Sequence, residues 1–267
     1  MKISNHTILI TGGTSGIGFE LATQLLALGN TVIITGRNQA KLDRIKREHP
    51  LLHTIQSDVN DPKAIASLYE RVSREYPALD ILINDAGVMR KINLQDKGFD
   101  LEDISREIET NLIGPVRIVK QFPPMLKAQP SAAIVNVSSG LAFTPFPISP
   151  IYCAAKAGVH SFTQSLRVQL NNTSVKVFEL APPFTQTPLQ HGFAPSDTKG
   201  SPMMDVKKLV RQAIRGFQKD RLEILPGLSK VLRLVNRIAP GLAVKVASGP
   251  VDAILAQTES LASTGGW

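Results

Sequence analysis

The sequence predicts an α/β protein: a doubly wound parallel sheet of about seven strands, with helices on both faces. Three observations predict it. Short apolar runs alternate along the chain with segments of helical periodicity. The first apolar run ends in a glycine-rich turn that leads directly into a helix. No internal repeat and no linker divides the 267 residues, so we expect residues 1–267 to form a single domain.

Seven runs rich in Val, Ile and Leu predict strands that are buried on both faces of the sheet. They are residues 7–10, 31–35, 52–56, 79–83, 133–137, 175–180 and 222–225. The intervening helices carry their own signals. A helix over residues 19–28 is followed by Gly29-Asn30, and Asp61-Pro62 places a capping side chain before a first-turn proline. Before the last strand, residues 206–217 carry an apolar stripe at helical spacing, which predicts a helix packed on the core.

Composition narrows the classes of function. The chain is 43% hydrophobic and 19% charged, which is typical of a globular protein, and its lone Cys153 excludes an internal disulfide. The basic residues behind the net charge of +8 are scattered, so we expect no nucleic-acid partner. His160 has no companion at ligand spacing, and no metal site is expected. Without a signal peptide or an apolar membrane span, the expected location is the cytoplasm.

The glycine-rich turn after the first strand predicts a dinucleotide site. Its glycines let the backbone approach a pyrophosphate, and the helix behind it offers free N–H groups and the positive end of its dipole. The residues expected to contact the cofactor here are Gly12, Thr14, Ser15, Gly16, Ile17 and Gly18.

The spacing TGxxxGxG resembles that of the short-chain dehydrogenases/reductases, and further motifs of that family follow in order. Residues 84–87 (Asn-Asp-Ala-Gly) resemble its NNAG, Asn111 lies in the next long helix, and residues 152–156 match YxxxK. The resemblance covers about residues 5–227, and residues 139–143 and 181–183 resemble one bacterial group within the family. It implies a Rossmann-type, NAD(P)-dependent oxidoreductase that acts on a small carbonyl or alcohol, as a homodimer or homotetramer.

Arg37 decides the expected cofactor. An NAD enzyme of this fold usually ends its second strand with a carboxylate for the ribose, whereas this chain has Thr35-Gly36-Arg37. A guanidinium suits a 2′-phosphate, so NADP(H) is preferred and NAD(H) is the alternative. The other interpretation of Arg37 is an exposed cation stacked on adenine.

The family resemblance implies further cofactor contacts. Asp58 and Val59 would touch adenine, and Thr187 the nicotinamide amide. The adenosine ribose side would be lined by Asn84, Ala86 and Gly87. Two residues depart from the family pattern: Asp85 replaces an asparagine, and Pro183 replaces a glycine that serves as a hinge.

Tyr152 is the expected catalytic acid/base. Lys156 lies four positions on, on the same helix face, where its charge would lower the pKa of the phenol. The resemblance implies that Tyr152 and Lys156 also hold the nicotinamide ribose, that Ser139 orients the substrate, and that Asn111 holds a water. Ser138 is the adjacent alternative to Ser139, and the alternative for Asn111 is a helix residue that caps or kinks the helix.

Three further predictions concern the substrate side of the cleft and the residue after Tyr152. A Pro-rich stretch at residues 184–202 predicts a lid, and Cys153 is expected to be a small packed side chain. An apolar substrate cleft is expected from Leu141, Phe143, Phe146, Ile148 and Phe184.

Residues 228–267 form a C-terminal extension that begins with an amphipathic pattern. Val231, Leu234, Val235 and Ile238 form its apolar stripe, and Lys230, Arg233 and Arg237 its basic face. A helix that covers the substrate pocket or forms a subunit contact is favoured over contact with a membrane surface. For the protein as a whole, a nucleotide-binding regulatory protein of an envelope pathway, with little or no turnover, is the alternative function.

Overall fold

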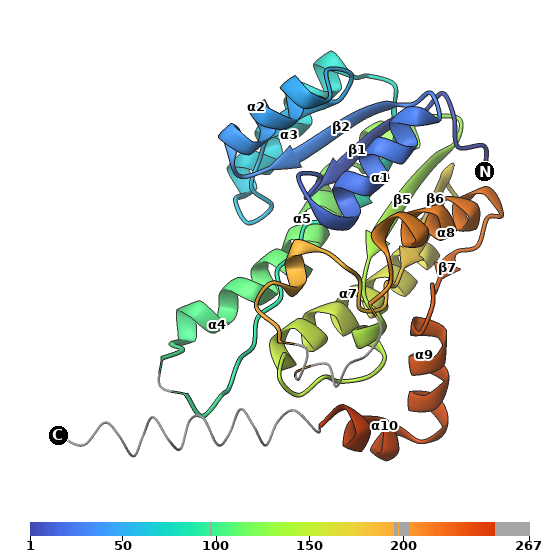
Figure 1. The fold of residues 1–267 in the computed structure, drawn as a ribbon. Helices are drawn as coiled ribbons and strands as arrows, with labels where there is room; N and C mark the ends of the chain where they lie inside the picture. Colours follow the sequence, from blue (N-terminus) through green and yellow to red (C-terminus); the bar gives the residue numbers. More distant parts are fainter. Residues whose placement is uncertain (97, 195–196, 198–202, 249–267) are drawn as a thin grey trace.

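The computed structural model describes residues 1–96, 98–194, 197 and 203–248. Its centre is a seven-stranded sheet in the order β3-β2-β1-β4-β5-β6-β7, with every neighbouring pair parallel (Figure 1). The strands are β1 Thr7–Thr11, β2 Thr31–Gly36, β3 His53–Gln56, β4 Leu79–Asn84, β5 Ala132–Val137, β6 Val175–Leu180 and β7 Glu223–Ile224. The predicted doubly wound parallel sheet is confirmed, and each predicted strand end lies within one residue of the observed one.

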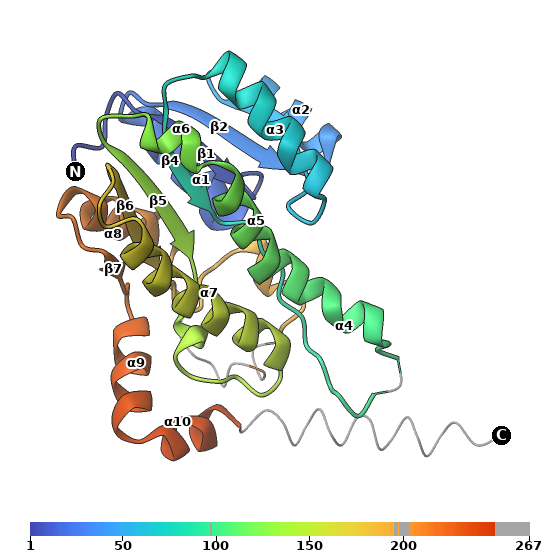
Figure 2. The same cartoon turned by 180° about the vertical axis from the view of Figure 1, so that it is seen from behind.

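Helices cover both faces of the sheet because its strands alternate their side chains between two apolar clusters. Ile8 and Ile10 point to one face, where they join α1, α2 and α8, and Leu9 points to the other, where α3, α5, α6 and α7 pack (Figures 1 and 2). The long helices are α1 Gly16–Ala27, α2 Gln39–Glu48, α3 Pro62–Glu75, α4 Leu101–Ile108, α5 Gly114–Gln121, α7 Pro150–Gln169 and α8 Val206–Gln218. Shorter helical segments are η1 Glu109–Ile113, α6 Pro123–Lys127, η2 Gly140–Ala142 and η3 Pro188–Gln190.

The helix signals of the sequence can be compared with the observed helices at α3, α1 and α8. The Asp61 side chain accepts from the N–H of Lys63 and caps α3, with Pro62 in its first turn. The first helix begins at Gly16, three residues earlier than predicted, because the glycine turn itself coils into it. On α8 the predicted stripe is buried at Leu209, Ala213 and Phe217.

The C-terminal helices α9 Ser229–Ile238 and α10 Pro240–Ala247 lie together at one end of the molecule, seen at the bottom of Figures 1 and 2. Three of the four members of the predicted apolar stripe of α9 are exposed, so for them the prediction of a cover over the substrate pocket is wrong, and a subunit contact stays a prediction. Val231, Leu234 and Ile238 are 52%, 57% and 74% exposed. The helix packs instead through the neighbouring face, which carries the buried Ser229. No helix in the described part of the chain is both long and apolar enough to span a bilayer.

Candidate active site

A cleft of about 600 Å³ opens where the parallel strands end, the position at which doubly wound sheets bind ligands. It brings together most of the residues predicted to bind cofactor or substrate. Those that line it are Gly12, Thr14, Ser15, Gly16, Ile17, Arg37, Asp58, Val59, Ala86, Gly87, Ser139, Tyr152, Lys156 and Thr187. Gly18, Asn84 and Asn111 are not in its lining and lie behind it.

The glycine turn is packed too closely for side chains. Gly12 has a φ of +71°, and a Cβ on it would lie 2.6 Å from Ala86 Cα. A Cβ on Gly18 would lie 2.6 Å from a carboxyl oxygen of Asp85. Gly16, with a φ of +58°, begins α1 beside Thr187. The turn therefore presents bare backbone and a helix N-terminus to the cleft, which is the cradle that a pyrophosphate requires.

The adenosine end of the cleft holds an unengaged guanidinium. Arg37 follows β2 and is exposed, and its backbone carbonyl accepts from Gln56 Nε2 at 2.8 Å. Among the described residues, no ion pair occupies its side chain. Asp58 and Val59 line the same end, and Val59 is buried against Gly114 of α5. Arg37, Asp58 and Val59 thus line one end of the cleft together.

Two predicted asparagines serve the frame of the site. Asn84, 3% exposed, donates to Asn136 Oδ1 at 2.9 Å inside the sheet. Asn111 lies in the π-helical turn η1, where its side chain bonds the N–H of Val88 at 2.9 Å and the C=O of Val88 at 2.7 Å. A Cβ on Gly87 would lie 2.9 Å from Asn111 Oδ1 and 3.7 Å from Lys156 Nζ. Asn111 is thus separated from Lys156 only by the bare backbone of Gly87.

The two serines after β5 point to different partners. Ser139, 7% exposed, hydrogen-bonds the Tyr152 phenol, and its hydroxyl accepts from the Leu141 N–H at 3.1 Å. Ser138 donates to Glu179 Oε1 at 2.5 Å, away from the phenol. This arrangement favours Ser139 over Ser138 as the substrate-orienting hydroxyl.

Tyr152 and Lys156 share one face of α7, but the sign of the expected pKa shift is wrong. Burial raises the pKa of Tyr152, and this outweighs the lowering by the Ser139 hydrogen bond. Lys156 Nζ lies 5.8 Å from the phenol ring and donates to the C=O of Val137 at 2.8 Å. Burial also lowers the pKa of the Lys156 ammonium. The phenol is therefore held in its protonated form.

Asp85, the departure from the family pattern, adds a carboxyl group that the sequence analysis did not use. It lines the cleft, and its side chain accepts from the N–H of Gly18 in the first turn of α1. Burial raises the pKa of Asp85, while Lys156 opposes that rise. In return, the Asp85 carboxylate raises the pKa values of Lys156 and Tyr152. The N–H of Asp85 donates to Thr11 Oγ1 at 3.2 Å, which ties the loop after β4 to the end of β1.

The substrate side of the cleft is mostly apolar, as predicted, but only some of the residues predicted to line it do so. Leu141 and Phe184 line it, whereas Phe146 and Ile148 lie in the apolar cluster behind. Phe143 is a correction, because its ring packs on His160 and beneath Arg233 instead of facing the cleft. The residues that sequence reasoning missed are Met89, Leu189 and Leu232. They come from separate loops and helices, so no local pattern marks them as neighbours.

The predicted lid contacts the loop that follows β4. Lys91 Nζ lies 2.9 Å from Asp197 Oδ2 and 6.0 Å from the centre of the Phe193 ring. The backbone carbonyl of Pro183 accepts a hydrogen bond from Thr185 Oγ1 at 2.8 Å. Residues 195–196 and 198–202 of the predicted lid are outside the described residues.

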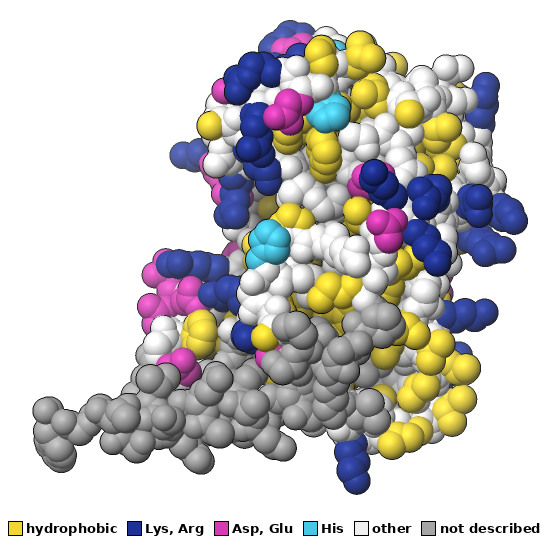
Figure 3. Space-filling view, in the orientation of Figure 1, with side chains coloured by type: hydrophobic (Ala, Val, Ile, Leu, Met, Phe, Trp, Pro, Cys, Tyr) yellow, Lys and Arg dark blue, Asp and Glu magenta, His cyan; other side chains and the backbone are white. Residues whose placement is uncertain are grey.

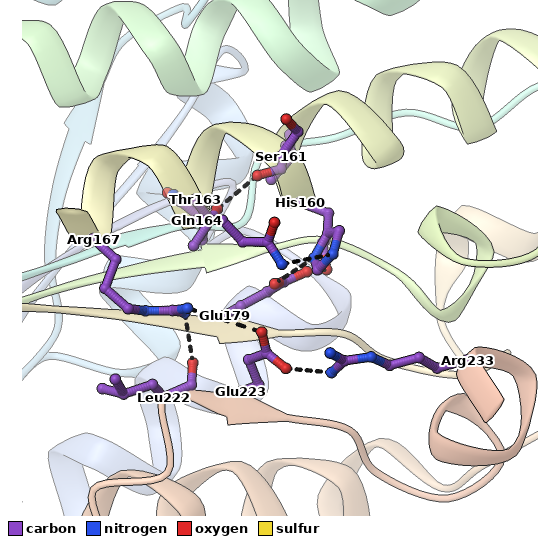
Figure 4. A network of polar contacts seen from close by, with 12 residues as sticks. His160, Ser161, Thr163, Gln164, Arg167, Glu179, Leu222, Glu223 and Arg233 are labelled. Carbon is purple, nitrogen blue, oxygen red and sulfur yellow. Dashed lines mark hydrogen bonds and ion pairs between the residues drawn. The ribbon is translucent and has the colours of Figure 1, made fainter. Parts of the chain in front are cut away.

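A network of hydrogen bonds and ion pairs links α7, β6, β7 and α9 (Figure 4). His160 Nδ1 on α7 lies 2.8 Å from the buried Glu179 of β6, whose other oxygen accepts from Ser138. Nearby, Glu223 of β7 pairs with Arg233 of α9 and lies 3.8 Å from Arg167 of α7 (Figure 4). The strand end that carries Ser139 is thereby tied to α7, and α9 is tied to the sheet.

Comparison with known proteins agrees with this architecture. The model of the short chain dehydrogenase family matches residues 6–197. The oxidoreductase DltE of Bacillus subtilis (strain 168), described as uncharacterized, is 49% identical over 189 residues, which cover 71% of this chain and 75% of DltE.

Two solved structures share the fold. A short chain dehydrogenase from Burkholderia cenocepacia in complex with NADP superposes with a TM-score of 0.79 at 23% identity, covering 91% of this chain and 97% of that one. A short chain dehydrogenase/reductase from Burkholderia phymatum in complex with NAD superposes with a TM-score of 0.77 at 21% identity, covering 89% and 95%.

The chain belongs to the short-chain dehydrogenase/reductase family. The family identification made from the ordered motifs is confirmed, and so is the expectation of an NAD(P)-dependent enzyme of this family. DltE belongs to the bacterial group that residues 139–143 and 181–183 resemble, so the closeness to that group is confirmed as well. The cytoplasmic location and the homo-oligomer stay predictions.

Proposed function

We propose that this protein transfers a hydride between NADP(H) and an apolar carbonyl/alcohol pair, with Tyr152 as the general acid/base. One observation carries the proposal: the Ser139 hydroxyl, the Tyr152 phenol and the Lys156 ammonium meet in one cleft with the glycine turn. The apolar lining from Met89, Leu141, Phe184, Leu189 and Leu232 supports a substrate with a hydrocarbon body.

The proposed roles of Ser139, Tyr152 and Lys156 follow from the protonation states of the phenol and the ammonium. Bound NADPH supplies the hydride that the carbonyl carbon accepts. Ser139 donates a hydrogen bond to the carbonyl oxygen as negative charge develops there, and Tyr152 gives it a proton. The raised pKa of Tyr152 keeps that proton in place beforehand, which suits reduction. Lys156 lies close enough to stabilise the phenolate that remains, and Asn111 lies beside Lys156 for the return of a proton.

NADP(H) is proposed over NAD(H) because of Arg37. One relative in this fold is described with NADP and another with NAD, so the fold accepts both dinucleotides. The end of β2 carries no carboxylate, and the exposed guanidinium of Arg37 beside it suits a 2′-phosphate. Asp58 and Val59 are proposed to contact adenine, and Thr187 the nicotinamide amide.

The catalytic proposal is tested with Tyr152→Phe. Nicotinamide absorbance is followed with NADPH against a panel of apolar aldehydes, ketones and quinones. The variant should lose about 100-fold or more of kcat, the usual contribution of a positioned acid, while NADPH affinity is kept. Tyr69→Phe is the matched control, because Tyr69 packs on Phe122 away from the cleft and should lose little activity. Full turnover by Tyr152→Phe would remove this residue from the chemistry.

The cofactor proposal is tested with Arg37→Ala. Loss of charge-assisted hydrogen bonds worth about 1.5–3 kcal/mol should weaken NADPH about tenfold or more and leave NADH unchanged. Arg44→Ala, on the exposed face of α2, is the control. An equal loss for both dinucleotides would contradict recognition of the 2′-phosphate.

The regulatory alternative predicts a different pattern in the same assays. NADPH would bind tightly and Arg37→Ala would weaken it, but no carbonyl on the panel would be reduced. The intact Ser139, Tyr152 and Lys156 favour the enzyme.

A further inference from the structure

The outer surface of the C-terminal helices is apolar and exposed. Five side chains make up what we call the α9–α10 face: Leu228, Val231, Leu234, Ile238 and Leu242, which are 45%, 52%, 57%, 74% and 58% exposed. In Figure 3 they fall where yellow side chains gather at the lower right, over α9 and α10. Contiguous apolar surface of this kind marks interaction sites, whereas isolated exposed leucines do not.

The contacts that α9 makes with the rest of the protein hold the α9–α10 face toward solvent. Ser229 is fully buried, and Thr144 Oγ1 donates to the C=O of Leu232 at 3.2 Å. Arg233 pairs with Glu223 and lies 5.5 Å from the centre of the Phe143 ring. Turning Leu234 and Ile238 inward would break all of these contacts at once. The exposed face is therefore part of the folded arrangement and not a helix left unpacked.

The charged side chains of the segment that carries the α9–α10 face are all positive. From residue 224 to residue 251 the sequence contains no Asp or Glu, but it contains Lys230, Arg233, Arg237 and Lys245. Lys230, Arg237 and Lys245 are exposed, and among the described residues they have no ion-pair partner. On α3, in contrast, Arg71 pairs with Glu75. The apolar face is thus flanked by cations that have no counter-charge of their own.

We propose that the α9–α10 face docks on the surface of an anionic lipid bilayer. Its leucines, valine and isoleucine would enter the interface between headgroups and acyl chains, and the flanking cations would meet phosphate headgroups. This combination of an apolar face and an uncompensated basic flank fits an anionic bilayer better than a second copy of the chain. A two-fold contact between two such faces would bring the cations of each against those of the other.

The test is sedimentation of the full-length protein with vesicles. Vesicles of phosphatidylcholine containing phosphatidylglycerol should bind it, with affinity falling as salt rises, and vesicles of phosphatidylcholine alone should bind it more weakly. Leu234→Ser combined with Ile238→Ser should weaken binding about tenfold or more. Leu51→Ser is the matched control, because Leu51 is 74% exposed in the turn before β3 and should leave binding unchanged.

A second variant separates charge from apolar contact. Changing Lys230, Arg237 and Lys245 together to Gln should weaken binding to the anionic vesicles and remove most of its salt dependence. Thermal unfolding and NADPH affinity, measured on every variant, show that the fold is kept.

Three results would overturn the proposal. The first is absence of binding to anionic vesicles, or binding that the serine variant keeps. The second is a dimer in solution that the serine variant converts to a monomer, which would make the face a contact between copies. The third is binding that appears only after residues 249–267 are deleted, which would make the chain's own C-terminal segment the occupant.

Discussion

Replacing Gly12 with alanine should both destabilise the fold and remove dinucleotide binding. The backbone of Gly12 is in the left-handed region, with a φ of +71°. An added Cβ would lie 2.6 Å from Ala86 Cα and 2.7 Å from Ala86 N, which are backbone atoms that follow β4. Neither atom belongs to a flexible side chain, so relief requires the glycine turn or the loop after β4 to move.

The expected cost has two parts. An L-residue in the left-handed region loses about 1–2 kcal/mol, and overpacking costs about 1–3 kcal/mol. Together they predict a loss of about 2–5 kcal/mol from the free energy of unfolding. Gly29→Ala is the matched control, because Gly29 has a φ of +80° but nothing within 4 Å of an added Cβ. It should show only the first part.

Urea unfolding of the two variants measures the difference, and titration with NADPH measures binding. Gly29→Ala should bind NADPH like the parent protein, and Gly12→Ala at least tenfold more weakly. If the two variants lose the same stability and both bind NADPH normally, the close approach of Gly12 to Ala86 does not form the cofactor site.

Other predictions concern the acid groups and the core. Asp85→Asn removes a carboxylate that raises the pKa of Tyr152, so in alcohol oxidation the pH at which kcat/KM rises should move lower; an unchanged profile would contradict the coupling. The hydrogen bond between His160 and Glu179 raises the pKa of His160 in the folded protein. The free energy of unfolding that this pair contributes is therefore complete below about pH 6.5 and is lost as the pH rises through the folded-state pKa. His160→Gln should flatten that part of the Tm-against-pH curve, and the same slope in both proteins would refute it. Phe217→Ala, at a buried ring that meets Phe178 edge to face, should cost about 3–5 kcal/mol by urea unfolding, and a loss below about 1 kcal/mol would contradict its place in the core.

Much of the fold follows from sequence because its strands are buried on both faces. The run of residues 175–180 is buried at every position except Lys176, and β6 spans the same residues. The glycine turn is equally local, since strand, turn and helix are consecutive. The last strand was the least defined: β7 is only Glu223–Ile224, an edge strand paired on one side.

The substrate side could not be derived in the same way, because its walls converge from distant segments. Phe143 and Leu141 are two residues apart, yet one packs on His160 and the other lines the cleft. Leu141 lies in the three-residue helix η2 and Phe143 follows it directly, and a segment this short has no periodicity from which side-chain directions could be predicted. On α9 the pattern identified an apolar stripe, but a pattern does not show which face finds a partner. The buried side of that helix, around Ser229, is the less apolar one.

The charge state of Tyr152 shows the limit of reasoning from a single pair. Four residues of helix do place Lys156 beside the phenol, but the pKa responds to every group around it. Burial raises the pKa of Tyr152, and the carboxyls of Asp85 and Glu107 raise it further. Glu107 is fully buried on α4, and Asp85 stands where the family pattern has a neutral asparagine. Both carboxyls raise the pKa of Tyr152, so they keep the phenol protonated before the reaction but also make it a weaker acid. Lys156 opposes the second effect by stabilising the phenolate once the proton has left.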